Sequence, residues 1–331
     1  MEPPRTVLII QTAFIGDVIL ATALIESLHQ KFPEVHLDFL VRKGNEELVL
    51  ENPQVTNVLI FDKSQKFKNL IKLILRIRKA RYDYVINVQR FATTGLMTIF
   101  SGAGKTIGFN KNPFSFLFSR RVRHEIDGLH EVERNHKLIA SLVGEPQGRP
   151  RLYPSQDQFE KVAPFKSEPY ITVSPASVWF TKQLKKEKWI EFLSDLPPQL
   201  NVFLLGAGSD FELCEVIRKE TCDRNLVNLA GKLSLLESAA LMKDARMNYV
   251  NDSAPMHLAS AMNAPVTAVY CSTVPLFGFG PLSDRSFIVE TPERLSCRPC
   301  GLHGHRACPQ GHFKCALTIR KEQLMDVLSG T

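Results

Sequence analysis

The stretch VLIIQTAFIGDVILATALIESLHQ, residues 7–30, decides the fold of this chain. It opens with Val7–Ile10, a continuous β-branched and leucine run that is typical of a strand buried on both faces of a sheet. Val18–Gln30 follows with helical periodicity, because Ile19, Ala23 and Leu28 can share one face. A buried strand that leads through a short loop into an amphipathic helix predicts strand–helix–strand units and therefore a parallel sheet.

The same alternation runs through the rest of the chain. In the first half it predicts strands near His36–Val41, Val58–Phe61, Tyr84–Val88 and Thr106–Phe109, and helices at Lys66–Ala80 and His130–Leu142. In the second half it predicts strands at Ile171–Ser174, Val202–Leu205, Leu226–Leu229, Met247–Val250 and Val266–Tyr270, and helices at Glu187–Leu196, Asp210–Lys219, Ser234–Lys243 and Pro255–Ala261. The fold class is thus α/β, with two Rossmann-like doubly wound parallel-sheet domains that face a central cleft.

The domain boundary is expected in the stretch from Gly144 to Pro169, which is rich in proline and has little periodicity. We therefore interpret this stretch as an interdomain linker. It separates an N-terminal domain, residues 1–155, from a C-terminal domain, residues 168–331.

Composition limits the class of protein. The 331 residues are 44% hydrophobic and 23% charged, which excludes a disordered chain, a collagen and a coiled-coil rod. Lys+Arg minus Asp+Glu is 41 − 34 = +7, a surplus that favours anionic partners. No secretory signal is evident at Met1–Arg5, and prolines interrupt the charge-free stretch Ser253–Ser283, so we expect a cytosolic protein with no membrane span.

The loop Gln11–Asp17 joins the first strand to the first helix. Gly16 permits a tight turn there, and Asp17 would face the cleft. Asp17 can either cap the helix or act as a general base that removes a proton from an attacking hydroxyl. The loop lacks GxGxxG and a Walker lysine, so neither dinucleotide nor P-loop chemistry is indicated.

Three further loops follow strands in the second half. The loop Ser174–Gln183 contains Ser177, Thr181 and Lys182, which suit phosphate oxygens, although such a lysine can also be a solvated surface charge. Gly206–Asp210 can accept hydroxyls of a ribose through Asp210, or be a plain turn with an Asp cap. In the segment Asn251–Ala259, a helix that starts near Asp252 and Ser253 offers its N–H groups and dipole to a diphosphate. His257 there is more typical of a buried core histidine.

The cysteines gather in the C-terminal tail. Four thiolates can complete a tetrahedral zinc site, but irregular spacing leaves reduced packing cysteines or a labile disulfide as alternatives; the four are Cys297, Cys300, Cys308 and Cys315. A disulfide framework that includes the scattered Cys214, Cys222 and Cys271 is not expected.

Cationic residues crowd the predicted helix Lys66–Ala80 and the group Arg120, Arg121 and Arg123. They can form a solvated face or attract the phosphate and carboxylate groups of a lipid-linked acceptor at a membrane surface. Aromatic residues are not interleaved as nucleic-acid binders need, so no nucleic-acid partner is expected.

These motifs, in this order, resemble the ADP-heptose:lipopolysaccharide heptosyltransferases. The resemblance is carried by Gly16–Thr22, the loop from Ser177 to Lys182, Asp252–Ala259 and the Cys-rich tail. It implies the two-Rossmann-domain B fold of glycosyltransferases, with acceptor binding by the N-terminal domain and nucleotide-sugar binding by the C-terminal one. It also implies an inverting transfer of heptose from ADP-heptose to the inner core of lipopolysaccharide, with no cofactor or catalytic metal.

The resemblance assigns roles residue by residue. Asp17 matches the catalytic base, with Thr12 and Gly16 in the same loop, and Lys182 matches the lysine that binds the donor diphosphate. Around the donor it places Asp210, Asp252, Ser253, Ala254 and His257, and the residues themselves add Ser177 and Thr181. Ala254 stands where a Gly is common, Gln11 where a Lys is frequent, and Gln183–Lys185 where Arg/His-Trp-Pro is usual, so the donor sugar and acceptor are less defined than the reaction type.

The implied partners are an ADP-sugar donor and an anionic lipid-linked core oligosaccharide. The protein is expected to act as a monomer, peripheral to the cytosolic face of the inner membrane. Two alternatives remain from the sequence: a related glycosyltransferase that uses another nucleotide sugar, and a non-catalytic nucleotide- or zinc-binding interaction protein.

Overall fold

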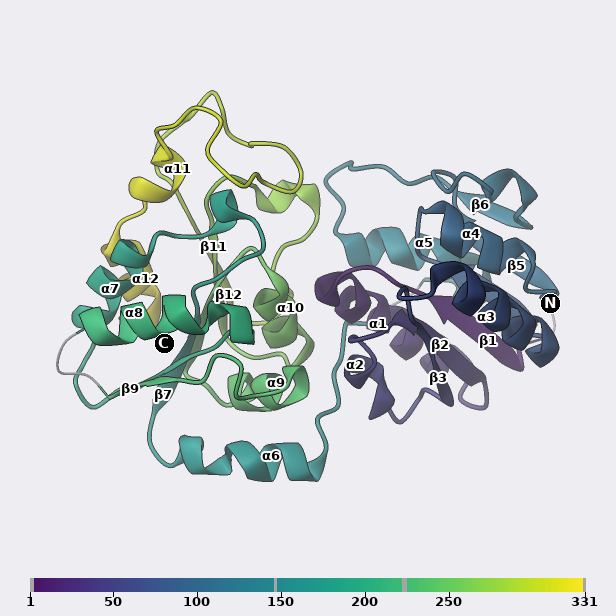
Figure 1. The fold of residues 1–331 in the computed structure, drawn as a ribbon, viewed down its shortest axis with the longest axis horizontal. Helices are drawn as coiled ribbons and strands as arrows, with labels where there is room; N and C mark the ends of the chain where they lie inside the picture. Colours follow the sequence, from purple (N-terminus) through teal and green to yellow (C-terminus); the bar gives the residue numbers. More distant parts are fainter. Residues whose placement is uncertain (1–2, 146–147, 222–224, 330–331) are drawn as a thin grey trace. The chain divides into compact units, whose positions relative to one another are not determined.

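A computed structural model describes residues 3–145, 148–221 and 225–329. The chain divides into two compact units, Met1–Tyr153 and Pro154–Thr331. Each contains a six-stranded parallel sheet with helices on its faces (Figure 1). The prediction of two Rossmann-like α/β domains is therefore confirmed, whereas the cleft between them stays a prediction.

The N-terminal unit builds its sheet in the order β3-β2-β1-β4-β5-β6. The strands are β1 (Thr6–Ile10), β2 (His36–Arg42), β3 (Asn57–Phe61), β4 (Tyr84–Asn87), β5 (Lys105–Phe109) and β6 (Arg120–Val122). The helices are α1 (Ile15–Lys31), α2 (Glu47–Leu50), α3 (Lys66–Ala80), α4 (Ala92–Ile99) and α5 (Glu131–Val143). Val7–Ile10 are fully buried, as a central parallel strand requires.

The C-terminal unit repeats this topology, because its order β12-β11-β10-β7-β8-β9 is the same winding with the strands renumbered. The strands are β7 (Tyr170–Ser174), β8 (Asn201–Leu204), β9 (Leu226–Asn228), β10 (Met247–Asn251), β11 (Val266–Tyr270) and β12 (Ser286–Glu290). The helices are α6 (Gln156–Val162), α7 (Lys186–Ser194), α8 (Phe211–Glu220), α9 (Leu235–Lys243), α10 (Ala254–Ala261), α11 (Lys314–Leu317) and α12 (Lys321–Ser329).

The stretch Gly144–Pro169, interpreted as an interdomain linker, contains a helix in its second half that the sequence did not predict. Ser155 accepts a hydrogen bond from Gln158 N–H and caps α6, and Val162 is fully buried. An ion pair of 2.7 Å between Lys161 and Glu237 ties α6 to α9. The prolines therefore flank a short helix of the C-terminal unit, and a helix of two turns is too short for periodicity to reveal. Pro146 lies outside the described residues.

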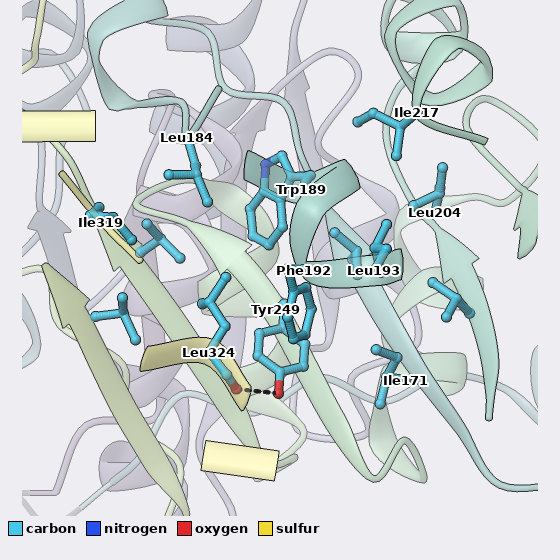
Figure 2. Close-up of a cluster of buried hydrophobic side chains, with 14 of the residues drawn as sticks. Ile171, Leu184, Trp189, Phe192, Leu193, Leu204, Ile217, Tyr249, Ile319 and Leu324 are labelled. Carbon is cyan, nitrogen blue, oxygen red and sulfur yellow. Dashed lines mark hydrogen bonds between the residues drawn. The ribbon is translucent and has the colours of Figure 1, made fainter. Parts of the chain in front are cut away.

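The core of the C-terminal unit is sealed by its last helix. Trp189 and Phe192 of α7 pack with Tyr249 of β10, and all three are fully buried (Figure 2). The Tyr249 hydroxyl donates a 3.0 Å hydrogen bond to the carbonyl of Leu324 in α12, which satisfies a phenol that would otherwise be buried without a partner. α12 is thus an integral part of this core.

The charge-free stretch Ser253–Ser283 forms α10, β11 and the 3₁₀ turn Pro275–Phe277. This confirms a short helix, a turn and a buried strand there, although the stretch holds one strand where several were expected. No helix in the described part of the chain combines the length and apolar character that a membrane crossing requires.

Candidate functional site

The strand order fixes where each unit can bind a ligand. In the N-terminal unit, β1 has β2 on one side and β4 on the other, so the chain winds away in opposite directions from the β1–β4 pair. In the C-terminal unit the equivalent pair is β7 and β10. Ligands of open α/β sheets bind at the carboxyl ends of such strands. The predicted site residues Asp17, Lys182 and Asp252 all follow strands of these two pairs.

Asp17 lies in the first turn of α1, directly after the β1 loop. Its Oδ2 accepts a 3.2 Å hydrogen bond from the Phe14 N–H, so the helix-capping alternative is part of its role. Gly16 belongs to the same helical turn, so the tight turn predicted at Gly16 is wrong: α1 begins at Ile15, three residues earlier than expected. Thr12 is buried in the loop before it.

Burial, and next the negative charge of Glu131, raise the pKa of Asp17 to about 6. The Phe14 N–H and the Arg90 guanidinium act in the opposite direction. An aspartate with this pKa is still mostly ionised at neutral pH, but it is a far stronger base than an ordinary exposed one. The arrangement therefore suits a carboxylate that takes up a proton during a reaction.

A buried polar network stands behind Asp17. Arg134 is almost fully buried and its Nε donates a 2.7 Å hydrogen bond to Glu131 Oε2. His124 Nε2 lies 3.8 Å from the same oxygen and 3.3 Å from Arg90 Nη1. Burial acts to raise the pKa of Glu131, but hydrogen bonding to His124 and the charge of Arg134 outweigh it and lower that pKa. Glu131 is thus held ionised beside Asp17.

In the C-terminal unit, two predicted donor-binding residues form an ion pair. Lys182 Nζ lies 2.7 Å from Asp252 Oδ2, and their side chains are 15% and 8% exposed. The Thr273 hydroxyl donates a second hydrogen bond of 2.7 Å to the same carboxylate oxygen. Lys182 is therefore not a solvated surface charge, and its ammonium group is held at the carboxyl end of β10.

The C-terminal tail holds the loop that carries Lys182. The Thr181 hydroxyl accepts hydrogen bonds from His305 N–H, at 2.7 Å, and from the Ser272 hydroxyl, at 3.0 Å. Thr181 is thus used in packing the loop against the tail. Ser177 lies earlier in the loop, and its carbonyl accepts a 2.5 Å hydrogen bond from the Gln183 side chain.

Helix α10 begins at the segment where an anion site is predicted. Ser253 is the N-cap, and its hydroxyl bonds the Asn251 carbonyl at 3.3 Å instead of a helix N–H. Ala254 opens the helix and Pro255, which has no N–H, follows it. His257 is buried on the inner side of the helix, as expected.

Asp210 forms a turn. Its Oδ2 accepts a 2.8 Å hydrogen bond from the Ala207 N–H, as the plain-turn alternative predicts. Gly206 faces this side chain closely, since a Cβ at Gly206 would lie 2.9 Å from the Asp210 Cβ. Contact with a ribose stays a prediction for Asp210.

The tail cysteines pack together without a disulfide among the described cysteines, which exclude Cys222. Burial and then the neighbouring thiols raise the pKa of Cys315 to about 11 and also raise that of Cys300. Cys297 Sγ lies 3.8 Å from His312 Nε2. In residues 3–145, 148–221 and 225–329, no three His, Cys, Asp or Glu side chains are arranged to hold a metal ion, so the zinc site is not confirmed.

Three polar residues of these sites were not predicted from sequence: Arg90, Glu131 and Thr273. Arg90 follows β4, the neighbour of β1, and Thr273 follows β11, the neighbour of β10. Their position just after a strand that neighbours β1 or β10 could have identified Arg90 and Thr273 as site residues. Glu131 had no such signal, because it reaches Asp17 only through the packing of α5 on α1.

The model of glycosyltransferase family 9 (heptosyltransferase) matches residues 70–307, well over half of the sequence. The chain belongs to this family. It is therefore a glycosyltransferase of the heptosyltransferase type, which confirms the family and the activity that the motifs implied. The matched residues include the Lys182 loop and Asp252 but begin after Asp17.

Curated relatives and solved structures agree with this membership. The lipopolysaccharide core heptosyltransferase OpsX of Haemophilus influenzae is 26% identical over 83% of this chain and 81% of its own length. Lipopolysaccharide heptosyltransferase 1 of Pseudomonas aeruginosa is 25% identical over 89% and 85%. The structure of Escherichia coli ADP-heptose heptosyltransferase II shares the fold, with a TM-score of 0.81, 20% identity and 98% coverage of both chains. The fold is thus that of the two-Rossmann-domain B type of glycosyltransferase.

Proposed function

We propose that this protein transfers heptose from ADP-heptose to an inner-core acceptor of lipopolysaccharide, with Asp17 as the general base. The observation that carries the proposal is the environment of Asp17. Its carboxylate lies at the carboxyl end of β1 in a glycosyltransferase, partly buried, with a pKa raised to about 6. A positioned base of this kind typically contributes about 10²–10⁴-fold to the rate.

The proposed step is one inverting displacement. An acceptor hydroxyl attacks the anomeric carbon of the heptose as the bond from that carbon to the diphosphate oxygen breaks. Asp17 takes the hydroxyl proton, and ADP leaves with the bonding electron pair. No covalent sugar–enzyme intermediate and no metal is needed for the balance of atoms and charge.

Negative charge develops on the leaving diphosphate, and the C-terminal unit offers groups that would stabilise it. Lys182 supplies an ammonium group that is already fixed in place by Asp252. The N–H groups of Ser253 and Ala254 begin α10, where the helix dipole is positive. Groups that are fixed before the reaction need no reorganisation as charge develops. We assign Ser177, Thr181 and His257 to the support of this diphosphate site and Asp210 to the nucleoside.

The acceptor is proposed to be anionic and lipid-linked, and to bind the N-terminal unit. Arg90 supports this assignment, because its exposed guanidinium interacts with Asp17 and would meet a carboxylate or phosphate of an approaching acceptor. We propose that the protein works as a monomer, peripheral to the cytosolic face of the inner membrane.

The experiment is turnover of the purified full chain with ADP-heptose and a delipidated core acceptor, read by product mass and ADP release. Wild type should form a product heavier by one heptose, and Asp17→Asn should lose turnover while it still binds ADP. Asp62→Asn is the matched control, since Asp62 is a carboxylate of the same unit that pairs with Lys43. UDP- and GDP-sugars test the alternative donors. Equal turnover of Asp17→Asn and wild type would overturn the role of Asp17, and a preference for UDP-sugars would overturn the donor.

A further inference from the structure

Helix α3 has more apolar surface than its packing uses. Leu70, Leu73 and Ile77 point into the core of the N-terminal unit and are at most 7% exposed. These three side chains account for the ordinary role of a Rossmann helix that covers a sheet. Ile74 packs partly against the same core, and most of the remaining helix surface is exposed and contains both apolar and cationic residues.

Three large apolar side chains form a stripe on the open surface. Phe67, Ile71 and Leu75 are 79%, 61% and 61% exposed. Residues four apart on an α-helix are turned by only about 40° from each other, so the three lie in one row along the helix. Single exposed apolar residues are normal on a protein surface, but a row of three on one helix is a candidate contact surface.

A cationic row runs beside this apolar stripe. Lys68, Lys72, Arg76 and Lys79 are exposed and follow the same helical spacing, about one quarter turn further round. Across residues 63–81 the sequence contains eight Lys and Arg and no Asp or Glu, so no acidic side chain in this stretch neutralises them. The charge of the surface therefore calls for an anionic partner.

We propose that this surface of α3, defined by the apolar stripe and the cationic row, docks on an anionic phospholipid bilayer. The cations contact lipid phosphates while Phe67, Ile71 and Leu75 enter the boundary between headgroups and acyl chains. This combination of a basic face and an adjoining apolar face is the physical basis of helices that lie in a membrane interface. This docking rests on the proposed function, because a lipid-linked acceptor is the reason for the enzyme to bind a membrane.

The place of α3 in the fold favours this partner. α3 follows β3, so its first turn with Lys66 and Phe67 starts from the carboxyl edge of the sheet. Asp17 lies at the same edge, after β1. A bilayer held along α3 would therefore present a lipid-linked acceptor on the side of the unit that carries the proposed base.

A nucleic acid would use the cations but not the stripe. Bases stack on aromatic side chains, and two of the three stripe residues, Ile71 and Leu75, are aliphatic. Their exposure is explained by contact with lipid, where aliphatic side chains gain from leaving water.

The test is cosedimentation of the full chain with vesicles in which about 30% of the phosphatidylcholine is replaced by the anionic lipid phosphatidylglycerol. Wild type should bind these vesicles, bind pure phosphatidylcholine at least about tenfold more weakly, and lose binding as salt is raised. The stripe variant Phe67→Ser/Ile71→Ser/Leu75→Ser should bind the anionic vesicles at least about tenfold more weakly than wild type. In a separate Phe67→Trp variant, the emission should shift to shorter wavelength on addition of anionic vesicles.

Two controls match these changes. Ile288→Ser/Leu317→Ser removes apolar residues that are 47% and 42% exposed in the C-terminal unit, and it should bind as wild type does. Lys68→Gln/Lys72→Gln/Arg76→Gln should weaken binding, whereas Lys137→Gln/Lys219→Gln/Lys314→Gln, which removes the same net charge elsewhere, should weaken it much less. Because the changed residues are exposed, thermal unfolding should confirm that each variant stays folded.

The proposal is wrong if wild type does not sediment with anionic vesicles, or if the stripe variant binds them as wild type does. Tighter binding to a DNA duplex than to vesicles would reassign the surface to nucleic acid and also overturn it. Vesicle binding uses neither donor nor acceptor, so its failure is separate from a failure of heptosyl transfer. The stripe variant should still turn over a delipidated acceptor at the wild-type rate.

Discussion

Lys182 Nζ lies 2.7 Å from Asp252 Oδ2, although the two residues come from loops after different strands, β7 and β10. The pair joins the two strands at which the winding of the C-terminal sheet reverses. A diphosphate that binds there would share the Lys182 ammonium group with Asp252, because that group is already paired with the carboxylate. The carboxylate thus fixes the position of the lysine and would also weaken its attraction for a bound diphosphate.

Lys182→Gln should therefore weaken ADP binding by about 10–100-fold, because one charged hydrogen bond to the diphosphate is lost. Titration calorimetry with ADP measures this. Lys185→Gln, three residues further along, is the control and should bind ADP as wild type does. An unchanged dissociation constant for Lys182→Gln would show that this lysine does not contact the donor.

Asp17→Asn should lower kcat by about 10²–10⁴-fold and leave the affinity for ADP within about twofold of wild type. The amide keeps the size of the side chain but cannot accept the hydroxyl proton. A release assay for ADP gives the rate, and calorimetry gives the affinity. Loss of ADP binding in parallel with turnover would instead indicate a structural role.

The pH dependence follows from the raised pKa of Asp17. Since the base must be ionised, kcat/KM should rise with pH through a midpoint near pH 6 and then level off. Glu131→Gln removes the charge that helps to raise the pKa, so its midpoint should lie at lower pH. Initial rates at low acceptor concentration across about pH 4 to 8, roughly two units either side of the midpoint, provide the measurement. A Glu131→Gln midpoint equal to that of wild type would contradict the electrostatic account.

The same pKa makes a prediction for stability. Because the folded pKa of about 6 exceeds the ordinary aspartate value of 3.8, the native state binds more protons between these pH values, and the free energy of unfolding falls as pH rises through them. Asp17→Asn has no carboxyl group to ionise, so its free energy of unfolding should not fall in this way. At neutral pH it should be more stable than wild type by about 1–3 kcal/mol. Urea unfolding should show this difference and its disappearance near pH 4, about the unfolded pKa of an aspartate. A variant less stable than wild type at neutral pH would refute the prediction.

Gly304 offers a test of the contact between the tail and the Lys182 loop. Its φ is +74°, and a Cβ there would lie 3.0 Å from both Lys182 Cγ and Thr181 Oγ1. Gly304→Ala should destabilise the protein by about 1 kcal/mol and also weaken ADP binding severalfold.

Gly311→Ala is the matched control, because Gly311 has a φ of +71° but a Cβ there would have nothing within 4 Å. It should share the backbone strain and leave ADP binding unchanged. If both variants bind ADP equally, the tail does not position Lys182.

The sheets were predictable from sequence because buried parallel strands are continuous apolar runs, and the ends of β1, β7 and β10 located the site loops. Pairing of Lys182 with Asp252 was not predictable, since it depends on which strands become neighbours. The raised pKa of Asp17 depends on burial and on Glu131, more than a hundred positions away in the chain. Short elements such as α6 and β6 were missed because too few residues repeat a pattern.

The docking of α12 has a consequence for biosynthesis. The N-terminal unit is complete by Tyr153, so we expect it to fold on the ribosome while the rest is translated. The second core needs Leu324, whose carbonyl accepts the hydrogen bond of the Tyr249 hydroxyl, so this half should stay incomplete until Leu324 has emerged from the ribosome. Nascent chains stalled before Lys321 should accordingly resist protease in the first half alone, and protection of both halves would refute this order.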